Sequence, residues 1–140
     1  MIGRLVKNLN KPPSEFVKAN WDAALNLRTK RMGIGIIVRD EGGEVLVIVC
    51  VQKKYVSQVA LAESYTLWKA IEICNDLDIR NVILEGDALT IVNVVNRDDE
   101  DLSWFGHIIE DIKFYPDRRK DWKVVYTPRE SNIAAYMLAK

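Results

Sequence analysis

The segment GIGIIVRDEGGEVLVIVCVQ, residues 33–52, contains two β-branched runs separated by a turn signal. Isoleucine and valine favour extended backbone, so the two runs predict strands at residues 33–40 and 45–52. Between them, DEGGE at residues 40–44 supplies the acidic residues and glycines that favour a tight turn. The segment therefore predicts an antiparallel hairpin.

A third strand is predicted upstream of this hairpin. From residue 16 to residue 25 apolar side chains alternate with polar ones, and the polar face carries Lys18, Asn20 and Asp22. The basic turn NLRTKR, residues 26–31, joins this strand to the hairpin, so we expect three consecutive antiparallel strands. The double proline of NKPPS disfavours both helix and sheet pairing, and residues 1–14 are predicted to form an extended lead-in.

Downstream of the hairpin the apolar period changes to that of helices, beginning with a long helix predicted at residues 57–77. The later elements are predicted as a strand at 81–87, helices at 87–96 and 102–115, a charged loop at 116–121, a strand at 122–128 and a closing helix at 129–140. A helix between the third and fourth strands allows parallel pairing after the meander. The sequence thus predicts one α/β domain over residues 1–140, with a five-stranded mixed sheet (three antiparallel strands, then parallel additions) flanked by helices.

Composition narrows the class of protein. The chain has 140 residues, 49% of them apolar, which is enough for a core without disulfides. Its 20 basic and 20 acidic residues balance, so any nucleic-acid binding must come from a local patch. Cys50 and Cys74 have neither zinc-site spacing nor a disulfide pattern, and we expect buried, reduced thiols. Without a secretory signal or a membrane-spanning run, an intracellular protein of cytosol or nucleus is expected, with no membrane partner.

Three carboxylates stand at unusual places. Glu63 shares the apolar stripe of the long helix, Asp22 lies inside a strand, and Asp87 ends the fourth strand. Each also has a plain explanation. Glu63 could lie at the margin of its stripe, Asp22 could be solvated, and Asp87 could be the N-cap of the next helix, helped by Thr90.

One topology would bring these carboxylates together. Parallel pairing of the first and fourth strands would place Asp22 and Asp87 on neighbouring strands. The long helix would lie across these strands and bring Glu63 close to them. Three converging carboxylates repel one another, which raises at least one pKa unless divalent cations neutralise them. Hard oxygen ligands suit Mg²⁺ or Mn²⁺.

Five segments, taken in order, carry a resemblance to a known family: FVKANWDAAL, GIGIIVRDEGGEVL, ALAESYTLWKAIEI, VILEGDALTIVNVVN and TPRESNIAAYMLAK. They resemble the ribonuclease H-like domain common in plant genomes, which is similar to the ribonuclease H portion of non-LTR retroelement reverse transcriptases. The match covers residues 11–140. The resemblance implies a metal-dependent endonuclease that hydrolyses the RNA strand of RNA/DNA hybrids with two Mg²⁺ (or Mn²⁺) ions. Asp22 would bridge the metals, while Glu63 and Asp87 would each bind one.

The resemblance breaks at the fourth acidic position. Active members usually carry Asp where this chain has Tyr136, after an Asn that corresponds to Asn132. A neutral phenol is a poor magnesium ligand, so one metal site should be weaker. Active members also often place a His before the last helix, whereas His107, the sole histidine, is expected on the surface or in helix packing. The alternatives are a catalytically impaired module that binds nucleic acid or a partner protein, and a structured retroelement remnant without a selected role.

Local basic clusters are the candidates for contact with an RNA/DNA hybrid or another nucleic acid, although each could simply be a solvated turn. Trp104 and Phe105 could stack on bases or lie in the core. The basic candidates are Arg28, Lys30 and Arg31 in the first turn, Lys53 and Lys54 before the long helix, and Arg118, Arg119 and Lys120 in the late loop.

Overall fold

The computed structural model describes residue 3 and residues 12–98, 106–118 and 121–140. Its centre is a five-stranded sheet in the order β3-β2-β1-β4-β5. The strands are β1 (Val17–Asn26), β2 (Arg31–Arg39), β3 (Val45–Lys54), β4 (Asn81–Gly86) and β5 (Asp121–Tyr126). β1, β2 and β3 pair antiparallel, whereas β4 pairs parallel with both β1 and β5. The predicted mixed sheet is confirmed.

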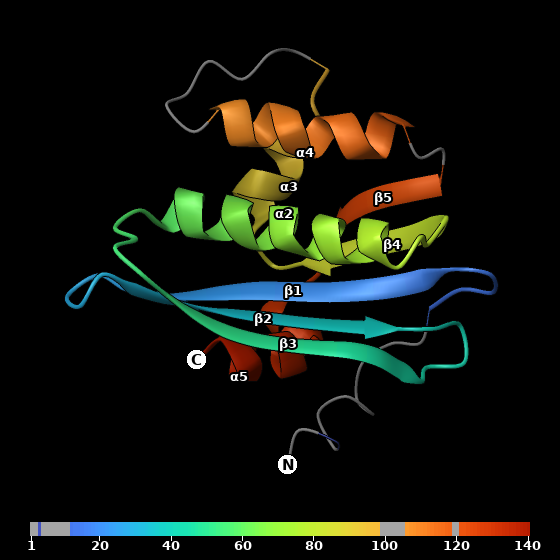
Figure 1. Cartoon of the computed structure of the whole chain (residues 1–140), viewed down its shortest axis with the longest axis horizontal. Helices are drawn as coiled ribbons and strands as arrows, with labels where there is room; N and C mark the ends of the chain where they lie inside the picture. Colours follow the sequence, from blue (N-terminus) through green and yellow to red (C-terminus); the bar gives the residue numbers. More distant parts are fainter. Residues whose placement is uncertain (1–2, 4–11, 99–105, 119–120) are drawn as a thin grey trace.

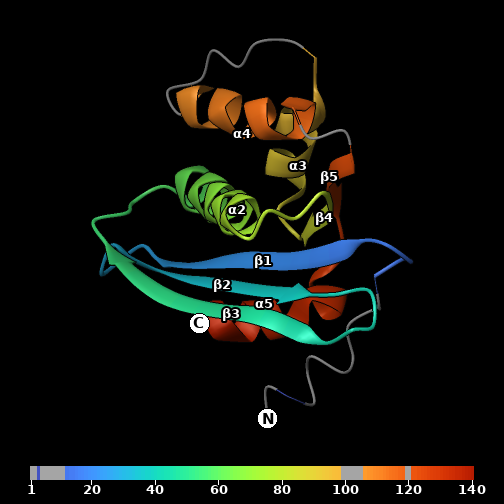
Figure 2. The same ribbon diagram turned by 45° about the vertical axis from the view of Figure 1, so that its right-hand side comes forward.

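Helices cover both faces of the sheet (Figure 1). The chain supplies α2 (Val59–Asp76), α3 (Leu89–Asn96), α4 (Gly106–Arg118), the short 3-10 helix η1 (Arg129–Asn132) and α5 (Ile133–Ala139). Figures 1 and 2 show α2, α3 and α4 on one side of the sheet and α5 on the other, against β1, β2 and β3. No helix within the described ranges is long and apolar enough to cross a membrane.

The β2–β3 hairpin forms as its sequence predicts. Asp40 Oδ1 accepts hydrogen bonds from the backbone N–H groups of Gly42 (3.0 Å) and Glu44 (2.9 Å). Gly43 has φ 85°, a left-handed conformation that glycine adopts without a steric penalty. The turn therefore fixes the register of the two strands.

The main core lies between the sheet and α2, where Trp21, Ile36, Leu67 and Ile71 are almost completely buried. The opposite face of β1 differs from the sequence expectation, because Lys18 and Asn20 are also buried. A solvated polar face was expected on β1. It is buried because β1 is a central strand with helices on both sides, as Figure 2 shows.

Three further expectations need correction. The closing segment is not one helix, since residues 129–132 form η1 before α5 begins. The helix predicted at 102–115 continues through Pro116 to Arg118, so the loop predicted at 116–121 starts later, while residues 102–105 lie outside the described residues. Cys50 is exposed because β3 is an edge strand, although its Sγ still contacts Leu138 O at 3.0 Å, while Cys74 is buried and both thiols are free.

Candidate active site

Asp22 lies on the central strand β1, opposite Gly35 of β2. Its exposed fraction is 3%, so the solvated alternative is wrong. Asp22 Oδ1 accepts a hydrogen bond from the backbone N–H of Ala23 at 2.9 Å. Asp22 Oδ2 is buried and receives no hydrogen bond from any described group. A buried acceptor without a donor is costly for folding and marks a place where a ligand would be favourable.

Parallel pairing of β1 and β4 brings Asp87 beside Asp22. Trp21 is registered with Gly86, so the two carboxylates follow at the next position of each strand. Burial raises the pKa of Asp22 to about 7, and the charge of Asp87 acts in the same direction. The N-cap explanation for Asp87 is wrong, since α3 is capped at Ala88 without a side-chain hydrogen bond.

Glu63 faces the same site from α2. It is half-buried, unlike the fully buried Ala62 and Leu67 of the same helix. Burial and then the charge of Asp87 raise the pKa of Glu63, and Arg129 acts in the opposite direction. Asp87 therefore acts on both Asp22 and Glu63 in the folded chain.

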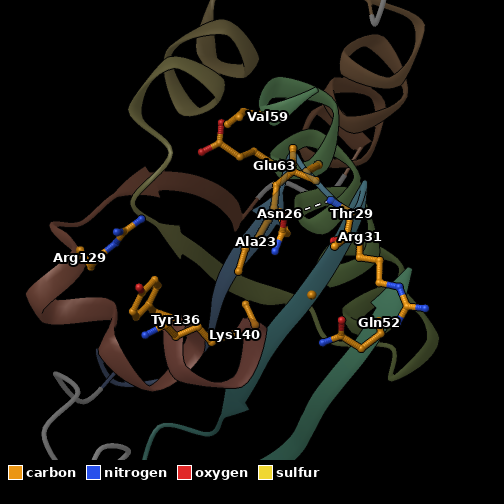
Figure 3. A pocket seen from close by; sticks show the side chains of 15 residues that line it. Ala23, Asn26, Thr29, Arg31, Gln52, Val59, Glu63, Arg129, Tyr136 and Lys140 are labelled. Atoms are coloured by element: carbon orange, nitrogen blue, oxygen red, sulfur yellow. Dashed lines mark hydrogen bonds between the residues drawn. The ribbon is translucent and has the colours of Figure 1, made fainter. Parts of the chain in front are cut away.

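A pocket of about 620 Å³ is lined by Glu63 but not by Asp22 or Asp87. Figure 3 shows Glu63 on the α2 wall, Arg129 and Tyr136 on one side, and Arg31 and Gln52 on the other. Lysine and arginine side chains that line this pocket could face a polyanion such as a nucleic-acid backbone. The polar and charged lining residues are Asn26, Thr29, Arg31, Gln52, Glu63, Arg129, Tyr136 and Lys140.

Tyr136 lies in this pocket wall and contacts an arginine to which the sequence assigned no role. The Arg129 guanidinium lies 4.4 Å from the centre of the Tyr136 ring, and Lys140 Nζ lies 5.4 Å from it. Arg129 Nε also donates a hydrogen bond to Asp87 Oδ2 at 3.0 Å. No local sequence pattern pairs Arg129 with Tyr136, because the chain changes from η1 to α5 between them.

A buried polar network positions η1 and α5 against the sheet. Asn132 Nδ2 donates to Trp21 O at 2.9 Å, and Asn132 Oδ1 accepts from Asn20 Nδ2 at 2.9 Å. Asn20 also bonds Glu85 Oε1 at 3.1 Å and accepts from Arg39 Nη2 at 3.3 Å. Because buried polar groups need their partners, this network fixes the start of α5 relative to β1.

The donor set fits a divalent cation. Asp22 Oδ2 lacks a donor, and the charge of Asp87 acts on both Asp22 and Glu63. Within the described ranges, no three acidic, thiol or imidazole groups lie close enough together to hold a metal ion. Asp22, Glu63 and Asp87 would therefore have to turn toward one another to hold Mg²⁺, with water or substrate supplying the other ligands.

The structure gathers two of the three basic clusters. Arg28, Lys30 and Arg31 are exposed in the β1–β2 turn, and Lys54 is registered opposite Arg31 across β2 and β3. Lys53 Nζ lies over the ring of Tyr65 at 4.1 Å. These five basic residues lie at one end of the sheet, where Arg31 reaches the pocket wall.

The third cluster and the aromatic candidates belong elsewhere. Arg118 ends α4, in the helical layer on the other side of α2, while Arg119, Lys120, Trp104 and Phe105 lie outside the described residues. His107 is exposed on α4, as expected for a surface residue.

Comparison with known proteins places the chain in a family. A family model described as reverse transcriptase-like matches residues 20–140. The chain belongs to the reverse transcriptase-like family. Comparison with curated protein sequences produced no match.

Three of the solved structures that are similar to this family member are ribonucleases H. Ribonuclease H1 of Halobacterium salinarum has a TM-score of 0.72 and 20% identity, covering 89% of this chain and 94% of that one. The N-terminal ribonuclease H domain of a Mycobacterium tuberculosis protein has a TM-score of 0.76 and 16% identity, covering 89% and 90%. LC11 ribonuclease H1 in complex with an RNA/DNA hybrid has a TM-score of 0.73 and 19% identity, covering 89% and 92%. At these identities the likeness confirms the predicted ribonuclease H-like fold.

Proposed function

We propose that this protein is a metal-dependent endonuclease that hydrolyses the RNA strand of RNA/DNA hybrids. The observation that carries the proposal is the convergence of Asp22 and Asp87 on adjacent parallel strands, with Glu63 facing them from α2. Glu63 lines a pocket that also includes the cations Arg31, Arg129 and Lys140, and Arg129 is bonded to Asp87. A site of this composition can bind a sugar-phosphate backbone and present oxygen ligands to a divalent ion.

Each part of the site has a chemical task. Asp22, Glu63 and Asp87 would hold Mg²⁺ or Mn²⁺, which when bound activates water and stabilises the charge of a leaving oxygen. The exposed turn with Arg28, Lys30 and Arg31 would bind backbone phosphates and orient the scissile strand. Hydrolysis by water would leave 5′-phosphate and 3′-hydroxyl ends.

The proposal is tested with a labelled RNA/DNA hybrid incubated in Mg²⁺ and, separately, in Mn²⁺. Wild-type protein should shorten the RNA strand, whereas Asp87→Asn should not, because it loses an ionised ligand. An Asp121→Asn variant is the matched control, since Asp121 is exposed at the start of β5, the end opposite the carboxylates. Equal inactivity of wild type and Asp87→Asn in both metals contradicts the endonuclease.

A catalytically impaired module that binds nucleic acid or a partner protein is the second candidate. One observation favours it: Arg129 Nε is already bonded to Asp87 Oδ2, an oxygen that would bind a metal ion in an active enzyme. Such a module would bind hybrid in fluorescence anisotropy with the same affinity in wild type and Asp87→Asn, and would cut it in neither.

We further propose that the chain belongs with the plant and non-LTR retroelement branch of this family and acts inside the cell, in cytosol or nucleus. The order and spacing of the five sequence segments quoted above support the branch. A phylogeny of reverse transcriptase-like domains that placed the chain outside that branch would contradict this origin.

A further inference from the structure

Arg129 lies where it can act on all three carboxylates of the site. Its Nε donates to Asp87 Oδ2 at 3.0 Å, and Asp87 is only 10% exposed. Its charge also acts on Asp22 and Glu63, opposing the effects of burial on both. The hydrogen bond with Asp87 in turn raises the pKa of Arg129, so the guanidinium stays charged.

Tyr136 holds that guanidinium from the other side. The ring lies 4.4 Å from the Arg129 guanidinium, within the range of a cation–π contact, and both residues line the pocket (Figure 3). The two residues come from η1 and α5, which the buried Asn132 ties to β1. Arg129 therefore projects from an anchored segment, although 58% of its side chain is exposed.

The charges of the site agree with this arrangement. Relative to a site with a fourth acid, Tyr136 removes one negative charge, and Arg129 bound to Asp87 adds one positive charge. The combined change equals the charge of one divalent ion. Three ionised carboxylates beside Arg129 therefore reach neutrality with a single divalent cation.

We infer that Arg129, positioned by the Tyr136 ring and the Asp87 carboxylate, is a resident cation that takes the place of a second divalent ion, so that this site binds one metal ion. The catalytic role of Arg129 in this inference rests on the proposed function. Its geometry is independent of that function. Tyr136 is then a positioning residue for Arg129 and not a failed metal ligand.

Metal stoichiometry tests the first part of the inference without any substrate. Calorimetric titration of the metal-free protein with Mn²⁺ should show one site in wild type and in Tyr136→Phe. The double variant Arg129→Met with Tyr136→Asp should show two. Arg129→Met alone should bind its first ion about tenfold more tightly, because a neighbouring positive charge is gone. Arg80→Met is the matched control, since Arg80 is exposed at the opposite end of β4 and should leave both quantities unchanged.

The Nε–H signal of Arg129 in ¹⁵N NMR tests whether the guanidinium stays in place. The signal should be protected from exchange in wild type and in Tyr136→Phe, which keeps the ring, and lost in Tyr136→Leu. It should persist when Mg²⁺ saturates the protein. Loss of the signal on adding Mg²⁺ would mean that the metal displaces Arg129, which overturns the inference.

The remaining outcomes separate this inference from the proposed function. Two equivalent Mn²⁺ sites in wild type, or identical NMR behaviour of Tyr136→Phe and Tyr136→Leu, overturn it whether or not hybrid is cut. If wild type cuts hybrid, Arg129→Met should cut more slowly, and faster cutting would show that Arg129 inhibits the site. If wild type cuts no hybrid but binds one Mn²⁺ ion and keeps the Arg129 Nε–H signal, the proposed endonuclease function is wrong. The inference that Arg129 replaces a second ion is then supported.

Discussion

Asp22 on β1 and Asp87 after β4 lie side by side because Trp21 and Gly86 are registered in a parallel pair. The relationship costs free energy, since Asp22 is 3% exposed and its Oδ2 has no donor among the described groups. A buried carboxylate oxygen without a donor is explained when a ligand or a reaction uses it. Four expectations follow from this pair and its surroundings.

Metal-free protein should become less stable as pH rises from Asp22's ordinary carboxyl pKa toward about 7, its value in the folded state. In that window the folded state keeps a proton that the unfolded chain has lost, so unfolding is favoured as pH increases. Urea titrations at about pH 5 and about pH 8 should differ by on the order of 2 to 4 kcal/mol in the free energy of unfolding. Asp22→Asn should flatten the dependence, whereas the exposed Asp121→Asn should not; a steep profile in Asp22→Asn would assign the effect to other groups.

Mg²⁺ should stabilise the folded protein through the same carboxylates. A ligand that binds only the folded state adds about 2.7 kcal/mol at a hundred times its Kd. The melting temperature of wild type should therefore rise with Mg²⁺ near neutral pH, and that of Asp87→Asn should rise much less. Equal shifts in wild type and Asp87→Asn would place the ion away from this site.

Gly35→Ala should displace α5 and with it Tyr136. A Cβ at Gly35 would collide with the backbone carbonyl of Ala135 and lie 2.7 Å from the backbone nitrogen of Ala139. Overpacking of this kind costs about 1 to 3 kcal/mol, measurable by urea unfolding. Gly42→Ala is the matched control, because its Cβ would meet only Asp40 Oδ1 at 3.4 Å. Equal stability of the two variants would show that α5 can shift without cost.

Hybrid binding should depend on the basic end of the sheet. Arg31 and Lys54 are registered neighbours there, and each is exposed. Arg31→Ala and Lys54→Ala should each weaken hybrid binding and lower the slope of log K against log salt by about 1, measured by anisotropy from about 50 to 200 mM salt. Arg80→Ala should change neither quantity. Unchanged salt slopes in Arg31→Ala and Lys54→Ala would mean that this end of the sheet does not contact the hybrid.

The strands and their pairing were largely predictable. Alternation over residues 16–25 and the DEGGE turn are local patterns, and they placed β1, β2 and β3 close to their observed bounds. Glu63 and Asp22 were recognised because each breaks a local rule for its element, and Asp87 because it ends a strand, where ligands of α/β sheets bind. Their convergence required one further step, the parallel pairing of β1 with β4, which the helix between β3 and β4 permits.

Arg129 was not predictable in the same way. Nothing in RESN distinguishes an arginine bound to Asp87 from a solvated one, since the two residues are 42 positions apart. The burial of Lys18 and Asn20 was likewise missed, because alternation reveals two faces of a strand but not whether a later helix covers the second face. Cys50 was missed for the converse reason, since edge strands keep apolar sequences while remaining exposed.

The amino-acid sequence by itself determined the mixed α/β sheet, the family and the three acids, because these follow from local periodicity, turn chemistry and residue order. Only the tertiary structure decided that Tyr136 packs on Arg129, that Arg129 pairs with Asp87, and that Asp22 is buried without a donor. These contacts join segments far apart in the chain. Their distances are set by how α5 packs against β1 and β2, which no short stretch of sequence encodes.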